Sequence, residues 1–72
     1  MTTTLTNEEK LNILTQHLRS LDYSIYGAEL DIIEAEAVSS PNSSDITAMN
    51  EKLTELNAKR TALLAEEAEL SA

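Results

Sequence analysis

Apolar residues recur at alternating steps of three and four through the first half of this 72-residue chain. The positions are Leu11, Leu14, Leu18, Leu21, Ile25, Ala28, Ile32 and Ala35. Apolar residues spaced in this way form one continuous stripe along an α-helix, as in the seam of a coiled coil. A strand would instead alternate with a period of two, so the pattern predicts one long helix.

Signals for the beginning and the end of this helix flank the stripe. Thr6 and Glu9 have the spacing of a capping box, in which each side chain accepts a hydrogen bond from the other residue's amide. After the stripe, the sequence VSSPNSSD interrupts the pattern. Pro41 disfavours helical geometry at Ser40, and the small polar residues around it favour a turn.

A second helix is predicted to follow the turn. Asn42, with Asp45 three residues later, is suited to cap its first turn. We therefore expect a single domain, residues 1–72, made of three parts. These are a helix over about 6–38, a turn over about 39–43 and a helix over about 44–70.

The second half of the chain repeats the spacing of the first. Its positions are Ile46, Met49, Leu53, Leu56, Arg60, Leu63, Glu67 and Leu70. If Ala35 faces Ile46 and the chain folds back on itself, every position of one stripe faces a position of the other. Both alanines then face a larger side chain, as close packing prefers. The predicted fold class is all-α, an antiparallel two-helix hairpin with coiled-coil packing, two of which would form a four-helix bundle.

Two charged residues, Arg60 and Glu67, occupy seam positions in the second helix. Their long stems can cover the seam while the charged ends reach water, with Asp22 available to Arg60. Alternatively, they make a polar contact inside a larger bundle that fixes its register or oligomeric state. The same register places two further pairs close together, Asp31 with Lys52 and His17 with Glu66.

A second apolar stripe on the first helix contains the only two aromatic residues of the chain. It consists of Tyr23, Tyr26, Leu30, Ile33 and Ala37. At about 100° per residue this stripe lies roughly 150° around the helix from the seam, so a two-helix hairpin leaves it exposed. Contiguous exposed apolar patches of this kind mark interfaces. Gly27, the only glycine, is unfavourable in a helix by about 1 kcal/mol relative to alanine, so it would allow another backbone to approach or mark a slight bend.

We call Tyr23, Tyr26, Gly27, Leu30 and Ile33 the tyrosine face, and we predict that it is an interface. A homo-oligomer is the first expectation, because so short a chain buries a limited core by itself. The outer surface of the second helix also offers small residues over which another helix could lie: Ala48, Thr54, Ala58, Thr61, Ala62, Ala65 and Ala68. A different protein, or packing of the chain ends against the stripe, are the alternatives.

The formal charge of −8 bears on the class of partner. It disfavours direct binding of nucleic acid or of an anionic membrane, which require a basic face. Acidic residues gather toward the turn: Glu29, Asp31, Glu34, Glu36, Asp45, Glu51 and Glu55. They form a solvated face that keeps the chain in solution, or they attract a basic protein partner, as in an inhibitor that mimics DNA.

The residues needed for catalysis or for a cofactor are scarce. Cysteine is absent, His17 is the only histidine, and no glycine-rich phosphate loop or Glu-x-x-His pair occurs. We expect no enzymatic activity, no cofactor and no metal site. The opening MTTTLTNEEK lacks the basic and then apolar pattern of a signal peptide, and no apolar run approaches the roughly 20 residues of a membrane span, so we expect a cytoplasmic protein.

Three stretches, MTTTLTNEEK, SSPNSSD and AKRTALLAEEAELSA, give the chain a characteristic texture. In this texture it resembles small uncharacterised proteins of tailed bacteriophages, notably those of marine cyanobacteria. The resemblance implies a setting in the host cytoplasm or the virion. Proteins of that setting are virion components, assembly helpers or inhibitors of host enzymes.

Overall fold

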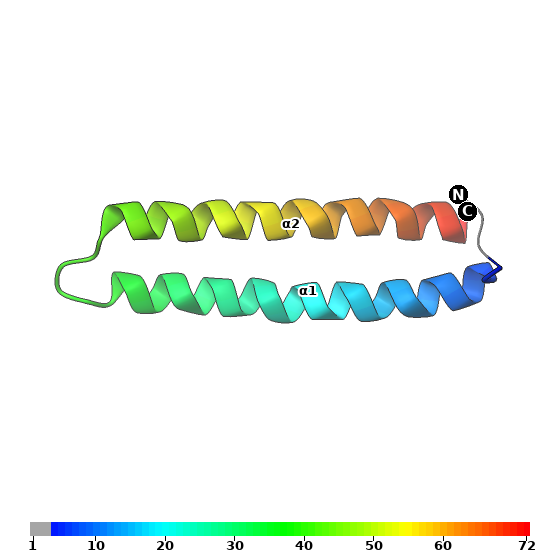
Figure 1. Ribbon diagram of the computed structural model, residues 1–72, viewed down its shortest axis with the longest axis horizontal. Helices are drawn as coiled ribbons and strands as arrows, with labels where there is room; N and C mark the ends of the chain where they lie inside the picture. Colours follow the sequence, from blue (N-terminus) through cyan, green and yellow to red (C-terminus); the bar gives the residue numbers. More distant parts are fainter. Residues whose placement is uncertain (1–3) are drawn as a thin grey trace.

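The computed structural model describes residues 4–72, which form two helices, α1 (Asn7–Glu36) and α2 (Ser43–Ser71). The helices lie side by side and antiparallel along their whole length, joined at one end by residues 37–42 (Figure 1). The resulting rod measures 54 × 18 × 17 Å. Residues 4–72 contain no strand, and the prediction of an all-α helical hairpin is confirmed.

The start of α1 is fixed by its predicted capping box. The Glu9 amide donates to Thr6 Oγ1 at 3.1 Å, and the Thr6 amide donates to Glu9 Oε1 at 3.0 Å. These hydrogen bonds satisfy two amides that have no partner within the helix. They also lower the pKa of the Glu9 carboxyl below its ordinary value of 4.5, first through the bond from the Thr6 backbone and then through the Thr6 side chain.

The connection between the helices is longer than the expected turn over about 39–43. Helix α1 ends at Glu36, where the Ala37 amide donates to the carbonyls of both Ile33 and Glu34 and tightens the last turn. Asn42 caps α2 as predicted, because its Oδ1 accepts from the amides of Ser44 at 2.9 Å and Asp45 at 3.2 Å. The helix bounds differ from the expected 6–38 and 44–70 by one or two residues, the usual extent to which helix ends vary.

The interior of the hairpin is the predicted seam. Every seam position of α1 and α2 is buried or half-buried, and among residues 4–72 the only other residue that is not exposed is Lys10. Leu14, Leu18 and Ala28 are the most deeply buried of these residues. Two helices can close a seam on one side only, so the core is thin, and each remaining seam residue keeps part of its surface in water.

In the single hairpin, Arg60 covers the seam with its stem and pairs with Asp22, as the first of the two interpretations expected. Arg60 is half-buried, and its Nε donates to Asp22 Oδ1 at 2.7 Å across the two helices. Both side chains stay substantially exposed, so the pair is worth about 0–1 kcal/mol and serves mainly to hold the register. The expected closeness of Asp31 and Lys52 produces no ion pair, since Arg60–Asp22 is the one ion pair among residues 4–72. Long exposed side chains gain little from being fixed in one geometry.

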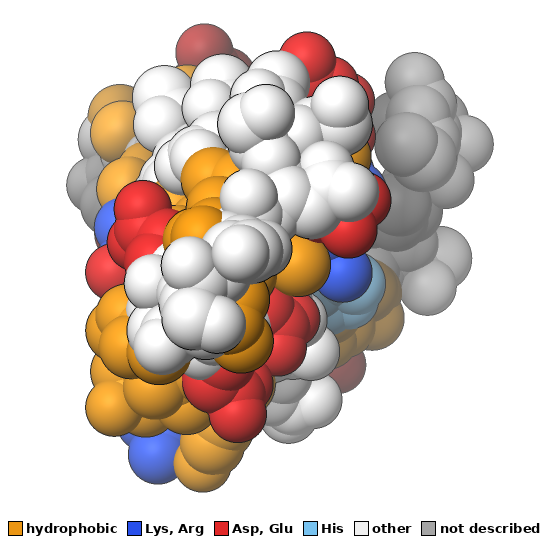
Figure 2. Space-filling view, turned by 90° about the vertical axis from the view of Figure 1, so that its left-hand side faces the viewer, with side chains coloured by type: hydrophobic (Ala, Val, Ile, Leu, Met, Phe, Trp, Pro, Cys, Tyr) orange, Lys and Arg blue, Asp and Glu red, His pale blue; other side chains and the backbone are white. Residues whose placement is uncertain are grey.

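Neither helix has the length and apolar character that crossing a membrane requires, as judged over residues 4–72. Most residues on their outward faces are polar or small. Figure 2, a view onto the turn end of the rod, shows acidic side chains among hydrophobic side chains and among other side chains and backbone. The exceptions to this polar surface lie mainly on α1.

Candidate interaction surface

The tyrosine face lies on the side of α1 that α2 does not cover. Tyr23 is 70% exposed, Tyr26 62% and Ile33 61%, and Leu30 is also exposed. Side chains of this size are ordinarily withdrawn from water, and here they are consecutive along one helical stripe. The structure therefore brings the predicted interface residues together as one outward apolar surface.

Gly27 lies within this surface and has no structural role in the single hairpin. Its backbone is helical, with no positive φ. A Cβ built at this position would meet no atom within 4 Å. An alanine would therefore fit, and it would favour the helix by about 1 kcal/mol. Any benefit of the glycine must therefore come from a contact outside the single hairpin or from a bend in the helix. Helix α1 continues through Gly27 without a break.

Arg19 borders the tyrosine face one helical turn before Tyr23. Its guanidinium carbon lies 5.5 Å from the centre of the Tyr23 ring, within the range of a cation–π contact. Arg19, Asp22, Tyr23 and Tyr26 line a shallow hollow at this end of the face. Asp22 also pairs with Arg60, so its carboxylate lies between this hollow and the seam.

A further exposed apolar residue lies between the tyrosine face and the turn in the sequence. Val38 is 56% exposed in the connection just beyond Ala37. In Figure 2, hydrophobic side chains gather over the lower part of the view, the side on which α1 lies. The periodic pattern placed residue 38 inside the helix. Its exposure was therefore not anticipated, although its position directly after Ala37 was a usable signal.

A second apolar feature, at the open end of the hairpin, was missed. A groove there is lined by Leu5, Lys10, Ile13, Leu14, His17, Leu63, Glu66 and Leu70. It brings His17 and Glu66 together, as the predicted register requires. Leu5 directly precedes the N-cap, where an apolar residue commonly packs onto the first turn, and here the stem of Lys10 is available to it. The position of Leu5 directly before the N-cap was the sequence signal that could have predicted this groove.

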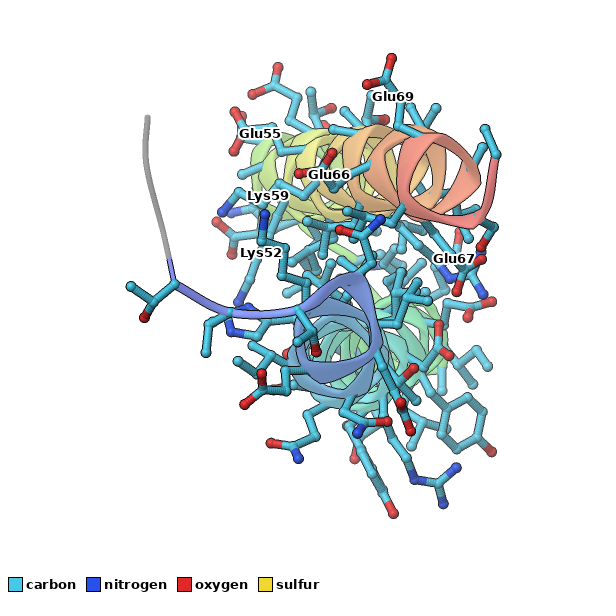
Figure 3. All side chains as sticks on the ribbon, turned by 90° about the vertical axis from the view of Figure 1, so that its right-hand side faces the viewer. Lys52, Glu55, Lys59, Glu66, Glu67 and Glu69 are labelled. Atoms are coloured by element: carbon cyan, nitrogen blue, oxygen red, sulfur yellow. The ribbon has the colours of Figure 1, made fainter. Side chains whose placement is uncertain are left out.

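Apart from Leu64, which is exposed, the outer surface of α2 consists of polar and small residues. Its small residues, including Ala58 and Ala62, are exposed. Thr54 and Thr61 donate their hydroxyls to carbonyls four residues earlier, which satisfies them within the helix. Figure 3 shows Lys52, Glu55, Lys59 and Glu66 along one flank of α2, and Glu67 on the opposite flank at the level of the seam. Glu67 thus reaches water from its seam position.

The acidic residues near the turn are all exposed. Over the described part of the chain, no cluster of three or more His, Asp or Glu side chains has an arrangement suited to a metal ion. The acidic charges are spread over both helices.

Comparison of the chain with protein-family models, with curated proteins and with solved structures finds no match. Its function is therefore inferred from the shape, the charge and the exposed side chains of the hairpin itself.

Proposed function

We propose that this protein is a non-enzymatic interaction module that self-associates through the tyrosine face of α1. The observation that carries the proposal is the exposure of Tyr23, Tyr26, Leu30 and Ile33 on one stripe of a helix whose opposite stripe already packs on α2. A helix with two apolar stripes needs two neighbours, and the hairpin supplies only one.

The surface area of the chain supports a second copy as the other neighbour. The hairpin exposes 5572 Å². A compact folded chain of 7.9 kDa exposes roughly 4,400 Å². The excess, on the order of 1,000 Å², is comparable to what each partner buries in an ordinary protein–protein interface, about 800 Å².

The chemistry of the face also suits an interface. Tyrosine combines a large apolar ring with a polar tip and loses little entropy when it is fixed, so it is common among the residues that dominate binding energy. The four apolar side chains expose on the order of 400 Å² per copy, and burial in both copies gives a total on the order of 1,000 Å² with the flanking stems. That area is near the lower limit for a stable interface, so we expect a dissociation constant on the order of micromolar.

The test is the solution mass by sedimentation over a hundredfold range of concentration around the micromolar range. The wild-type chain is expected to shift from the 7.9 kDa monomer to a multiple of it as concentration rises. Tyr23→Ala with Tyr26→Ala removes most of the exposed apolar area and is expected to keep the chain monomeric. Both tyrosines lie outside the seam, so the double variant should keep its helical circular dichroism.

A wild-type mass of 7.9 kDa at every concentration would contradict the proposal. So would a double variant that associates as tightly as the wild type, since association would then use another surface.

The acidic surface favours a second candidate of a different class, an inhibitor that occupies a basic groove on a nucleic-acid-handling protein. Its support is the exposure of seven carboxylates toward the turn, with Lys52 the one basic residue among them. Such a surface accelerates association with a basic partner, and added salt weakens the binding.

The two candidates respond to different substitutions. Glu29→Gln, Glu34→Gln and Glu36→Gln together should abolish binding to a basic partner and leave self-association mostly intact, because exposed charges contribute little to a contact made by apolar side chains. The double tyrosine variant should do the reverse. A triple glutamine variant that stays monomeric while the wild type associates would count against both assignments.

A further inference from the structure

The outward stripe of α1 has the same spacing in either direction along the chain. It runs Arg19, Tyr23, Tyr26, Leu30, Ile33, Ala37, with steps of four, three, four, three and four. A stripe with this symmetry can match an antiparallel copy of itself at every position. We propose, on the basis of the proposed self-association, that two hairpins pair through α1 in antiparallel orientation about a two-fold axis beside Gly27.

The pairing gives each large side chain an apolar partner. Tyr23 of one copy faces Ile33 of the second copy, and Tyr26 faces Leu30. Shifting one helix by a heptad breaks this match, because Tyr23 then faces Ser40 in one direction and Ile33 faces Gln16 in the other. The symmetric register is therefore the one that withdraws the whole stripe from water.

Gly27 acquires a role in this arrangement. It flanks the stripe at its centre, so the two Gly27 residues face each other across the two-fold axis. With no side chain at position 27, this flank of the interface leaves room for the large side chains of the stripe to pack between the helices. The open space around Gly27 in the single hairpin is thereby filled by the second copy.

Charge favours the antiparallel over the parallel orientation. A parallel pair would place the two Arg19 side chains together and would stack the acidic turn ends on each other. In the antiparallel pair, Arg19 of each copy faces Ala37 of the second copy, near Glu34 and Glu36. The helix dipoles also oppose each other in this orientation. Each hairpin thus brings a positive charge to the acidic end of the other.

The overlap covers residues 19–37, which lie toward the turn, so the two rods are offset. At 1.5 Å per residue the pair would be roughly 75 Å long, whereas a parallel pair in register would keep the 54 Å of one hairpin. The four helices would lie with both α1 helices at the centre and both α2 helices outside.

Disulfide trapping tests this orientation, because the native chain has no cysteine. Arg19→Cys and Ala37→Cys each leave the tyrosine face intact, and the two variants are mixed and oxidised at a concentration where the wild type associates. In the antiparallel pair, residue 19 lies opposite residue 37 of the second copy. Two copies of residue 19 are about 27 Å apart, too far for a disulfide. The 19–37 disulfide is expected in at least about tenfold excess over either symmetric one.

Ala58→Cys is the matched control, since Ala58 is exposed on the face of α2 away from the seam. It should give no cross-link above that of random collision. Predominant 19–19 and 37–37 disulfides would overturn the antiparallel arrangement while leaving self-association through α1 in place. A wild-type chain that stays monomeric in sedimentation would overturn the proposed function, and this inference with it. Association without any of these disulfides would place the contact elsewhere and overturn the inference.

Discussion

At Gly27, the requirements of the single hairpin differ from those of a pair of hairpins. The helix alone would be more stable with alanine, because glycine loses more backbone entropy on folding and nothing nearby excludes a methyl group. Close approach of a second α1 would reverse that preference. One substitution therefore acts in opposite directions on folding and on association.

Gly27→Ala is expected to stabilise the dilute monomer by about 0.5–1 kcal/mol, which raises the melting temperature by about 4–8 °C per kcal/mol in a chain of this size. The dissociation constant of the dimer is expected to rise several-fold, because the added methyl group takes up space that the second copy would fill. Circular dichroism and sedimentation measure the two effects. Ser24→Ala, three residues earlier and outside the tyrosine face, should leave the dissociation constant unchanged. Unchanged association in Gly27→Ala would contradict the close contact.

Glu9 gives a pH dependence of known sign. Its hydrogen bonds from Thr6 lower its pKa in the folded state below 4.5. The folded state therefore binds the Glu9 proton less readily than the unfolded chain does. This contribution to stability is fully present above about pH 4.5 and is lost as the pH falls through the lowered pKa.

Glu9→Gln keeps a side-chain oxygen that can accept from the Thr6 amide, but it removes the titration. We expect the melting temperature of this variant to fall less than that of the wild type between pH 5 and the lowered pKa. Thermal unfolding followed by circular dichroism measures the difference. Glu51→Gln, an exposed position in the middle of α2, serves as the control. An identical acid response of wild type and Glu9→Gln would contradict the assigned role.

The cap and the seam residues of each helix lie within one continuous stretch of sequence. For this reason the sequence predicted the seam position by position, together with the caps at Thr6 and Asn42. Lys10 and Val38 were missed because their environments depend on non-helical residues at either end of α1, which no periodic pattern describes. The tyrosine face could be predicted as exposed and apolar.

Ile32 and Ile33 are neighbours in the sequence but lie on different faces of α1, so an alanine substitution at each position tests one face at a time. Ile32 is half-buried in the seam, and Ile33 is exposed on the tyrosine face. Ile32→Ala is expected to destabilise the hairpin by roughly 1–2 kcal/mol, below the usual range for a fully buried site. Ile33→Ala should change the stability of the monomer by less than about 0.5 kcal/mol and weaken association instead. Equal loss of stability in both variants would show that the two faces are not distinct.

The molecule as a whole is extended. Its radius of gyration is 16.4 Å, against roughly 11 Å for a compact domain of this length. The net charge of −8 is distributed over this long surface, so two copies repel each other. In the antiparallel pair, the two Glu29 side chains face each other on the opposite flank of the stripe from Gly27 and add to that repulsion.

Self-association is therefore expected to become tighter as salt is added. The charges are exposed, and at 0.15 M ionic strength they are screened beyond about 8 Å, while burial of the tyrosine face is not weakened. Sedimentation at low salt and near 0.5 M measures the change, and a several-fold decrease in the dissociation constant is expected. Dissociation on adding salt would instead indicate that oppositely charged surfaces hold the copies together.

Because the start of α1 and the end of α2 lie at the same end of the rod, a force applied between them acts across the seam rather than along it (Figure 1). The two helices would separate one pair of facing seam residues at a time, from Leu11 and Leu70 toward Ala35 and Ile46. Such an opening needs far less force than sliding two helices past each other. The layers beneath the tyrosine face lie nearest the turn and would separate last, so a pair joined through that face would hold together until most of each hairpin had been pulled apart.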